Sequence, residues 1–353
     1  MLFRSALILE LSDGQRTAAQ LSDDLAPLLA GGLEACLPWM QSAEADGLLK
    51  IVPPDAPSAS GPSADDFADL ASELRSDGHV LAAFVCQHYA TLQLEDVADQ
   101  WVALGELAHI VGRRDDAREA YERYLALSPG DAEVEHILVS LRDEPPPPRA
   151  PDRVIRELYA RFATYYERNM CGDLEYQAPA RLADALDAEL GDAHDLEVLD
   201  LGCGTGLAGT FLRPRARRLV GIDLSPEMID KARVTGLYHV LEVGEITEWL
   251  TRGDTPFDLI TACDTLIYFG DLAQVLTPAA RRLRSGGVMA FTVERGETES
   301  FRLTDSGRYV HSESHIRAAA SAAGLSIVRV AEVQLRYEYG QPVVGLVTVL
   351  RKP

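Results

Sequence analysis

Glycines at alternate positions follow a short apolar run in the stretch Val198–Gly206, which reads VLDLGCGTG. Gly202, Gly204 and Gly206 lack a Cβ, so the backbone there can approach a ligand closely. The apolar run predicts a buried strand, and the residues from Leu207 predict a helix whose N-terminal amides point at the same space. A strand, a glycine turn and a helix N-terminus in this order predict a site for a cofactor.

The spacing of these residues indicates the kind of cofactor. A dinucleotide-binding turn requires G-x-G-x-x-G, and here the third glycine comes one residue early. Asp200 stands before the first glycine, and we expect its carboxylate to be aimed at the ligand. A carboxylate there would repel a pyrophosphate, but it suits a ligand that carries an ammonium and a sulfonium. The spacing therefore favours a sulfonium cofactor over NAD.

A second acidic residue ends the next predicted strand, within Arg218–Asp223. Asp223 is placed to accept hydrogen bonds from both hydroxyls of a ribose, as an acid about 20 residues further on does in nucleotide-binding βαβ units. Leu224 follows it, and Ser225 as N-cap with Pro226 at the first helical position predicts another helix. These residues predict a ligand that contains a ribose.

Ordered motifs extend the pattern along the chain. Together they resemble those of class I S-adenosylmethionine-dependent methyltransferases over roughly residues 152–353. The resemblance implies S-adenosylmethionine as cofactor, with Glu245 near the adenine amino group and Ile246 packing on the ring. The motifs are Asp200–Gly206, Gly221–Ser225, Gly244–Ile246, Phe257–Cys263 and Leu283–Val288. The cofactor-binding residues that it implies are Asp200, Gly202, Cys203, Gly204, Gly206, Asp223, Leu224, Glu245, Ile246 and Cys263.

Strands alternating with helices predict a Rossmann-like α/β domain, with a parallel sheet wound on both faces. The resemblance implies that the last strand runs antiparallel. The predicted strands are Leu196–Leu201, Leu219–Ile222, Tyr238–Leu241, Phe257–Ala262, Val288–Val293, Leu325–Gln334 and Val343–Leu350.

Aromatic residues in a predicted amphipathic helix, Val154–Met170, have two interpretations. Their spacing is typical of a core stripe. The segment also resembles the one that covers the cofactor in the methyltransferase family, which makes Tyr159, Tyr165 and Tyr176 candidate lid residues. Electron-rich rings beside a sulfonium would be favourable by ~0.5–2 kcal/mol.

Polar residues after the fourth predicted strand are expected to face the reacting groups, because ligands of such sheets lie beyond the carboxyl ends of the strands. Asp264 and Tyr268 are the candidates for contacts with the cofactor's methionine part or with the acceptor. Cys203 and Cys263 are interpreted as small apolar residues beside the cofactor rather than a reactive pair.

A general base is needed only if the methyl acceptor is a hydroxyl or a protonated amine, because the sulfonium is already activated. His311 lies in Gly307–His315, a segment that resembles a family motif over the mouth of the active site. We predict that His311 is the base or an acceptor-binding group. The alternative is a solvated or helix-capping histidine.

Composition limits the possible partners and surroundings. The net charge is −22 over 353 residues, and no long basic run is present, which argues against a nucleic-acid substrate. The five cysteines are scattered without a C-x-x-C pair, which predicts a reducing compartment and no metal site. No apolar run reaches ~18 residues, so we expect neither a membrane span nor membrane binding, and a cytoplasmic protein.

The N-terminal part predicts separate modules. Residues 1–52 resemble a winged helix, either a PqqD-like peptide-recognition element or the dimerisation domain of small-molecule O-methyltransferases, with DNA binding or plain packing as alternatives. Residues 53–63 form a linker by composition. Residues 64–142 resemble tetratricopeptide (TPR) repeats, because Trp101, Gly105, Ala117 and Pro129 fit that pattern and Gly78 lies 34 residues before Gly112. The final helix of this region is expected to cap the repeats.

Four consecutive prolines within residues 143–151 predict a semi-rigid strut before the methyltransferase domain of residues 152–353. The whole arrangement resembles bacterial TPR-containing class I methyltransferases related to the Williams–Beuren-region family. Three functions are compatible with it. The first is methylation of an O or N nucleophile in a small molecule, such as a specialised metabolite, with residues 1–142 serving dimerisation or acceptor entry. The second is methylation of a peptide or protein recruited by those modules. The third is a protein that binds S-adenosylmethionine only structurally.

Overall fold

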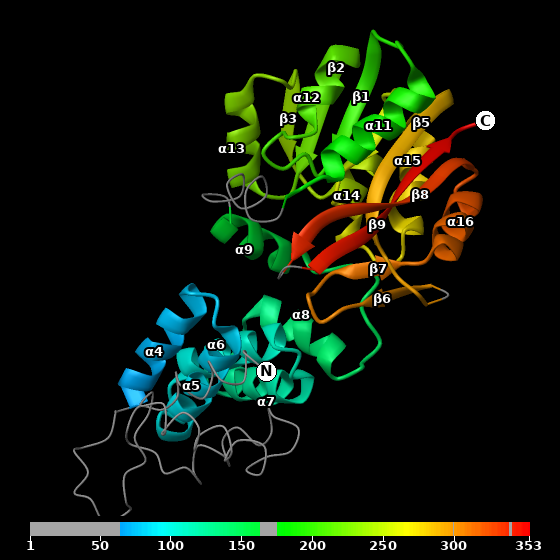
Figure 1. Cartoon of the computed structure of the whole chain (residues 1–353). Coiled ribbons are helices and arrows are strands. Elements are labelled where there is room, and N and C mark those ends of the chain that lie inside the picture. Colours follow the sequence, from blue (N-terminus) through cyan, green and yellow to red (C-terminus); the bar gives the residue numbers. More distant parts are fainter. Residues whose placement is uncertain (1–63, 163–174, 299, 339–340) are drawn as a thin grey trace, which may run out of the picture. The chain divides into compact units, whose positions relative to one another are not determined.

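The fold is given by a computed structural model, which describes residues 64–162, 175–298, 300–338 and 341–353. The chain divides into two compact units, Met1–Asp131 and Ala132–Pro353 (Figure 1). The predicted winged-helix-like segment and the linker that follows it lie outside the described residues.

The described part of the first unit consists of successive helices joined by short turns. Helix α4 contacts α5, α5 contacts α6, and α6 contacts α7. Small residues let the last pair approach closely: a Cβ on Gly105 would lie 2.5 Å from the ring of Tyr121, and Ala108 and Ala117 are fully buried. The helices are α4 (Ala64–Ser76), α5 (Val80–Gln93), α6 (Ala98–Ile110) and α7 (Arg114–Leu127).

The two helix pairs share one turn geometry. Gly78 and Gly112, which lie 34 residues apart, both adopt positive φ, at 83° and 77°. The residue after each glycine donates its backbone N–H to a carbonyl five residues back, from His79 to Leu74 and from Arg113 to Ala108, at 2.8 Å in both. Such left-handed glycines end helices at no steric cost. The turns at Gly78 and Gly112 therefore have the same backbone geometry, and the TPR interpretation of these helices stays a prediction.

The second unit is built on one mixed sheet. Among the described residues it has nine strands, in the order β3-β2-β1-β4-β5, beyond which β5 pairs both with β7 of the β6–β7 hairpin and with β9 of the β8–β9 pair. Strands β1 to β5 are parallel, and β9 runs antiparallel to β5, as predicted. The strands are β1 (Leu196–Leu201), β2 (Ala216–Asp223), β3 (Val240–Val243), β4 (Phe257–Ala262), β5 (Leu283–Arg295), β6 (Phe301–Leu303), β7 (Tyr309–His311), β8 (Ser326–Glu338) and β9 (Gln341–Arg351).

Helices cover both faces of this sheet (Figure 1). Leu199 and Ile260 belong to a core cluster with α14, α15 and α16, whereas Val198 and Leu259 belong to a cluster with α11. This alternation within β1 and β4 follows from the period of two in a strand. The helices of this unit are α8 (Ala132–Leu141), α9 (Asp152–Phe162), α11 (Ala178–Leu190), α12 (Gly209–Leu212), α13 (Pro226–Thr235), α14 (Ile246–Arg252), α15 (Ala273–Arg282) and α16 (Glu313–Ala322), with short 3-10 turns η2 (Arg213–Arg215) and η3 (Leu266–Tyr268).

The β6–β7 hairpin was not predicted from the sequence, and helix α8 packs against it. The His136 ring nitrogen Nε2 lies 3.1 Å from the carbonyl of Gly307, and the Ser140 hydroxyl donates to the Asp305 carboxylate at 2.7 Å. The sequence predicts that this helix caps the repeats. In the structure it belongs to the second compact unit.

The proline-rich segment is hydrogen-bonded to the sheet domain rather than free. The Pro148 carbonyl accepts the N–H groups of Gly270 and Asp271, at 2.9 and 3.0 Å, and Ala150 donates to the Tyr268 carbonyl at 2.8 Å. The Tyr309 hydroxyl also donates to the Pro147 carbonyl, at 2.7 Å. Proline lacks an N–H but keeps its carbonyl, so the run can accept hydrogen bonds from a neighbouring loop. The predicted strut is in fact part of the site's framework.

Candidate active site

The glycine turn follows β1 with the backbone that its composition predicts. Gly202, Gly204 and Gly206 have φ of 66°, 53° and 96°, in the region that favours glycine. The N–H groups of Gly202 and Cys203 donate to the Ile222 carbonyl at 2.8 and 3.0 Å, which ties the turn to β2. A Cβ on Gly202 would lie 2.3 Å from the Thr265 side chain. Only glycine fits at that position.

The helix expected from Leu207 is shorter than predicted. Only the single turn α12 forms, and it passes directly into the 3-10 turn η2, which contains Pro214. A proline inside a helix removes a hydrogen bond and clashes with the preceding turn. The turn is therefore followed by a single helical turn rather than a long helix, and the Asp223 carboxylate lies against it.

Asp223 ends β2 and faces the glycine turn. Its Oδ2 accepts the N–H of Gly204 at 2.8 Å, and its Oδ1 accepts the N–H of Ser225 at 2.9 Å. Burial raises the pKa of Asp223, while these N–H donors oppose the rise. A carboxylate oxygen can accept more than one hydrogen bond, so acceptor capacity for ribose hydroxyls is left. The predicted cap is present too, because the Ser225 hydroxyl accepts the N–H of Met228 at 3.2 Å at the start of α13.

Glu245 follows β3 and is the N-cap of α14. Its Oε2 accepts the N–H of Glu248 at 2.8 Å. Its Oε1 is buried without a hydrogen bond and lies 3.7 Å from Nη1 of Arg149. Buried acceptors are almost always hydrogen-bonded, so Oε1 is suited to a donor from a ligand. Ile246 lies beside it and is buried.

Asp200 lies beneath the turn rather than in the pocket wall. Its Oδ2 accepts the hydroxyl of Tyr238 at 2.7 Å, and its Oδ1 accepts that of Thr261 at 2.9 Å. Burial raises the pKa of Asp200 to about 6. A Cβ on Gly206 would lie 3.1 Å from the Tyr238 ring, and one on Gly209 2.8 Å from it. The sequence predicts that Asp200 contacts the ligand directly. In the structure its carboxylate instead binds Tyr238 and Thr261, and through Tyr238 it supports the glycine turn.

Tyr159 of α9 and Tyr268 of η3 meet over the pocket. Their hydroxyls are 2.9 Å apart and their rings are nearly perpendicular. The Tyr176 hydroxyl instead lies 3.7 Å from Sγ of Cys263, outside the pocket wall. Tyr165 lies outside the described residues. Of the predicted lid tyrosines, Tyr159 is the one that the structure places at the pocket.

The loop after β4 brings Cys263, Asp264 and Thr265 into the pocket wall. Asp264 has a φ of 54°, which is uncommon for a residue with a side chain. Its N–H donates to the Thr292 hydroxyl at 2.8 Å, and its Oδ2 accepts Nη1 of Arg336 at 2.8 Å. Burial raises the pKa of the Cys263 and Cys203 thiols well above the usual value. Both cysteines therefore stay neutral thiols.

His311 is fully buried in β7, away from the pocket wall. Its ring stacks on His315 at 5.5 Å, and neither ring nitrogen has a hydrogen-bond partner. Burial, together with His315, lowers the pKa of His311 to about 3. A neutral imidazole without access to the pocket is not placed to take a proton from an acceptor. The predicted role of His311 as a base is not supported by this position.

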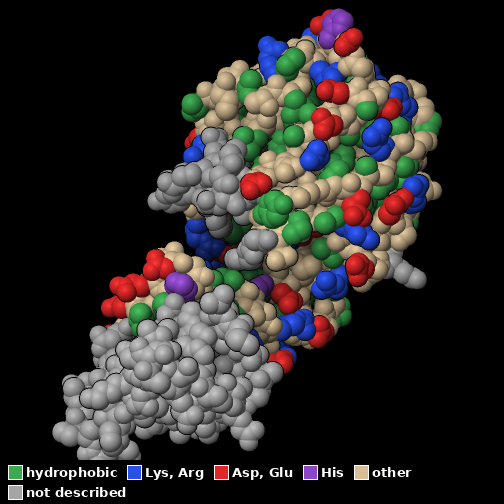
Figure 2. All heavy atoms as spheres, viewed as in Figure 1, with side chains coloured by type: hydrophobic (Ala, Val, Ile, Leu, Met, Phe, Trp, Pro, Cys, Tyr) green, Lys and Arg blue, Asp and Glu red, His purple; other side chains and the backbone are tan. Residues whose placement is uncertain are grey.

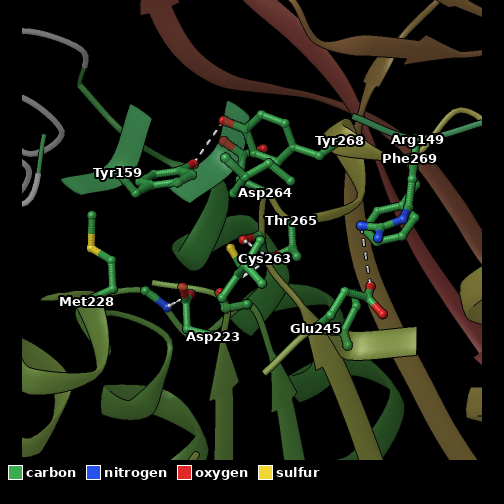
Figure 3. A pocket seen from close by; sticks show the side chains of 15 residues that line it. Arg149, Tyr159, Asp223, Met228, Glu245, Cys263, Asp264, Thr265, Tyr268 and Phe269 are labelled. Atoms are coloured by element: carbon green, nitrogen blue, oxygen red, sulfur yellow. Dashed lines mark hydrogen bonds and ion pairs between the residues drawn. The ribbon is translucent and has the colours of Figure 1, made fainter. Parts of the chain in front are cut away.

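Residues from several of these segments line the same pocket. Tyr159, Asp264 and Tyr268 lie at one end, Asp223 and Met228 at another, and Cys263 and Thr265 between them (Figure 3). Gly202, Gly204, Leu224 and Ile246 complete its floor. Glycine backbone, a buried acid and apolar side chains suit a ligand with a sugar, a flat ring and a cationic end.

Arg149 is a pocket residue that sequence reasoning missed. It comes from the proline-rich segment, lies 2.6 Å from Asp152 and 3.7 Å from Glu245, and has its guanidinium 5.9 Å from the centre of the Phe269 ring. Figure 3 shows it beside Glu245 and Phe269. Because Arg149 directly follows four prolines, its sequence neighbourhood predicts a linker. No motif around it indicates a residue of the pocket wall.

Two further observations concern the described residues only. In that part of the chain, no group of three or more His, Cys, Asp or Glu side chains is arranged to hold a metal ion. None of its helices is both long and apolar enough to cross a membrane. On the visible face of the second unit, basic and acidic side chains are interspersed (Figure 2).

Residues 198–287 match the family model described as "Methyltransferase domain". The chain is 32% identical over 164 residues to the malonyl-[acyl-carrier protein] O-methyltransferase of Serratia marcescens. This match covers 46% of the present chain and 59% of the Serratia protein. It is 31% identical over 171 residues to the ubiquinone biosynthesis O-methyltransferase of Xanthomonas oryzae pv. oryzae (strain PXO99A). This second match covers 44% of the present chain and 70% of the Xanthomonas protein.

Among solved structures, the chain is similar to magnesium protoporphyrin IX methyltransferase from Synechocystis PCC 6803 with bound SAM. The TM-score is 0.45 at 16% identity, over 57% of this chain and 97% of that one. The chain spans 53–60% of the length of the malonyl-[acyl-carrier protein] O-methyltransferases that it matches.

Proposed function

The chain belongs to the S-adenosylmethionine-dependent methyltransferases, and we propose that it transfers a methyl group to an oxygen or nitrogen nucleophile of a small molecule. When bound, S-adenosylmethionine supplies a methyl group on a positively charged sulfur. Such a transfer requires chiefly that the acceptor be held in line and that water be excluded.

The observation that carries the proposal is the fit of the pocket to that cofactor. Glycine backbone without a Cβ, the Asp223 carboxylate and the unsatisfied Glu245 Oε1 line the same space. In our proposal Asp223 binds the ribose hydroxyls, and Glu245 accepts from the adenine amino group. Leu224 and Ile246 pack on the adenine ring, because both are buried and apolar.

The small-molecule assignment is supported by the names of the relatives and by the narrowing of the pocket at Tyr159 and Tyr268. The names of two matched proteins, the malonyl-[acyl-carrier protein] and ubiquinone biosynthesis enzymes, denote O-methyltransferases. In this chain Tyr159 and Tyr268 narrow the end of the pocket opposite Asp223, which leaves room for a limited group there. A metabolite, or one side chain of a peptide, fits this arrangement.

A peptide or protein acceptor is the second candidate. The repeated turn geometry at Gly78 and Gly112 favours it, because stacked TPR-like helix pairs commonly present a surface to a partner. The same helices could instead form a homodimer. We therefore propose that residues 1–142 either bind a peptide or protein acceptor or form a homodimer.

The test is methyl transfer from labelled S-adenosylmethionine into a lysate of the native host that lacks this gene. Full-length protein is added, products are separated by size, and the Asp223→Asn variant is run in parallel as a matched control. We expect label in small molecules with the wild type and little with the variant. Label confined to protein would favour the second candidate, and equal labelling by the variant would contradict the proposed site.

A further inference from the structure

A buried ionic network lies behind the end of the pocket formed by Tyr159 and Tyr268. Its centre is Arg336 of β8, whose side chain is only 4% exposed. The Arg336 guanidinium donates to Asp264 at 2.8 Å, to Glu338 at 2.7 Å, and to Glu294. A single guanidinium thus holds carboxylates from the β4 loop, β5 and β8.

Arg308 of the hairpin turn completes this network. It donates to Glu294 Oε1 at 2.7 Å and to Glu338 Oε2 at 2.6 Å. The buried ionic network therefore contains three carboxyl groups and two guanidinium groups, and its net charge is −1 when every member is ionised. Buried charges are tolerated only when they are paired and hydrogen-bonded, and each guanidinium here is engaged by at least two carboxylates.

Asp264 is the member of the network that lines the pocket, whereas Arg336 and Arg308 do not. Its carboxylate is fixed by Arg336 on one side, and its uncommon backbone conformation is held by Thr292. Among the described pocket residues the one basic side chain is Arg149, which is already near Asp152 and Glu245. Negative charge therefore dominates the Asp264 end of the pocket.

We infer that the methyl acceptor presents an O–H or N–H donor to Asp264, as a hydroxyl or an amine does, and that it is not a carboxylate. This inference rests on the proposed function. A second carboxylate beside Asp264 would be repelled in a poorly hydrated site, whereas a donor gains a charge-assisted hydrogen bond. Burial raises the pKa of Asp264 against the opposing effect of Arg336, which makes the carboxylate a stronger base than a free one.

The acceptor oxygen or nitrogen uses its lone pair to form the new bond to the methyl carbon. The carbon–sulfur bond breaks, and its electron pair stays on sulfur. The proton of the acceptor's O–H or N–H goes to the Asp264 carboxylate and from there to solvent. Arg336 acts as a positioning residue, because it reaches the acceptor only through Asp264.

The first test uses binding and needs no knowledge of the acceptor. Sinefungin carries an amine in place of the transferable methyl group, whereas S-adenosylhomocysteine carries nothing there. We expect full-length protein to prefer sinefungin, and Asp264→Asn to reduce the ratio of the two Kd values about tenfold. Asp258→Asn is the matched control, because Asp258 lies in β4, just before the loop that carries Asp264, but pairs with Arg284 outside the pocket. An unchanged ratio in Asp264→Asn overturns the inference.

The second test uses the wild-type protein, so it does not depend on whether a variant folds. Product labelled in the host lysate is treated with mild base, which hydrolyses methyl esters and releases volatile methanol but leaves methyl ethers and methylamines intact. Base-stable label supports a hydroxyl or amine acceptor. Release of the label as methanol overturns the inference while leaving the proposed function standing. Absence of any label would count against the proposed function, and the Kd ratio would still decide the inference.

Discussion

The two ends of the pocket are constructed differently. At the Asp223 end, the central hydrogen bond joins Asp223 to Gly204, 19 residues away along adjacent parallel strands. At the Asp264 end, the corresponding bonds join Tyr159 to Tyr268 over 109 residues and Arg336 to Asp264 over 72. The first end is made from one βαβ unit, and the second from segments scattered through the domain.

This difference has a functional consequence. A cofactor common to a whole family can be held by a local unit whose glycine and acid spacing is set by backbone geometry. The acceptor end depends on side chains from the β4 loop, β8 and the hairpin, which can change without disturbing the glycine turn. We therefore expect variants at the two ends to affect different measurements: affinity for S-adenosylhomocysteine at one, and the sinefungin preference at the other.

The largest effect on affinity is expected from Gly202→Ala. The new Cβ would lie 2.3 Å from Thr265 at a φ of 66°, so the turn must shift. Strain and displacement of about 3 kcal/mol correspond to a loss of roughly 100-fold in affinity for S-adenosylhomocysteine by calorimetry. Gly324→Ala is the control, because φ is 72° there with no atom within 4 Å of the new Cβ. If the two variants bound equally well, close packing of the turn would not matter.

Asp223→Asn is expected to cause the second-largest loss of affinity for S-adenosylhomocysteine. In the proposed binding mode it replaces a charged acceptor of the ribose hydroxyls with a neutral one, and it also weakens the acceptor of the Gly204 and Ser225 N–H groups that holds the turn. Hydrogen bonds to charged groups are worth about 1.5–3 kcal/mol, so affinity for S-adenosylhomocysteine should fall roughly 10- to 100-fold. The ratio of sinefungin to S-adenosylhomocysteine affinity should stay constant, since Asp223 lies at the other end. A change in that ratio would mean that the two ends are not separable.

Tyr238→Phe should act on stability more than on affinity. Burial raises the pKa of Asp200 from 3.8 to about 6, so the folded state disfavours its ionised form as the pH rises through that interval. Above pH 6 the anion depends on the Tyr238 hydroxyl, and its loss should cost about 1.5–3 kcal/mol at pH 8 but about 1 kcal/mol at pH 5. Urea unfolding at both pH values measures this. Tyr309→Phe, whose hydroxyl meets the uncharged Pro147 carbonyl, should cost the same at both.

His311→Leu should leave both ligand measurements within about twofold of the wild type, because His311 lies outside the pocket wall. Burial lowers the pKa of His311 from 6.5 to about 3, so in that range only the unfolded chain binds the proton and the wild type loses stability as the pH falls. Between pH 7 and 4.5 this contribution amounts to about 3 kcal/mol, which the variant should lack. The exposed His194→Leu is the control. If His311→Leu lost the preference for sinefungin, His311 would have to contact the ligand site after all.

Much of the sheet could be predicted from the sequence. Strands β1 and β4 have the predicted bounds, because each is a short, mostly apolar run, followed by Gly202 after β1 and by Cys263 and Asp264 after β4. The β6–β7 hairpin was missed, since its three-residue strands carry no periodic signal and form only by pairing with β5. The proline-rich segment was likewise interpreted by composition alone, although its carbonyls bind the loop at 270–271.

The sequence by itself determined the glycine turn and the acid that faces it. Positive φ at Gly202 and Gly204, and an acid at the end of the next strand, are local requirements that residue types reveal. Only the tertiary structure decided that Asp200 supports the turn from below, that His311 is buried away from the pocket, and that Arg149 reaches it. Side-chain direction and burial depend on contacts between distant segments, and no spacing rule within one segment contains them. The Asp264–Arg336 pair, which we propose sets the charge of the acceptor site, is such a contact.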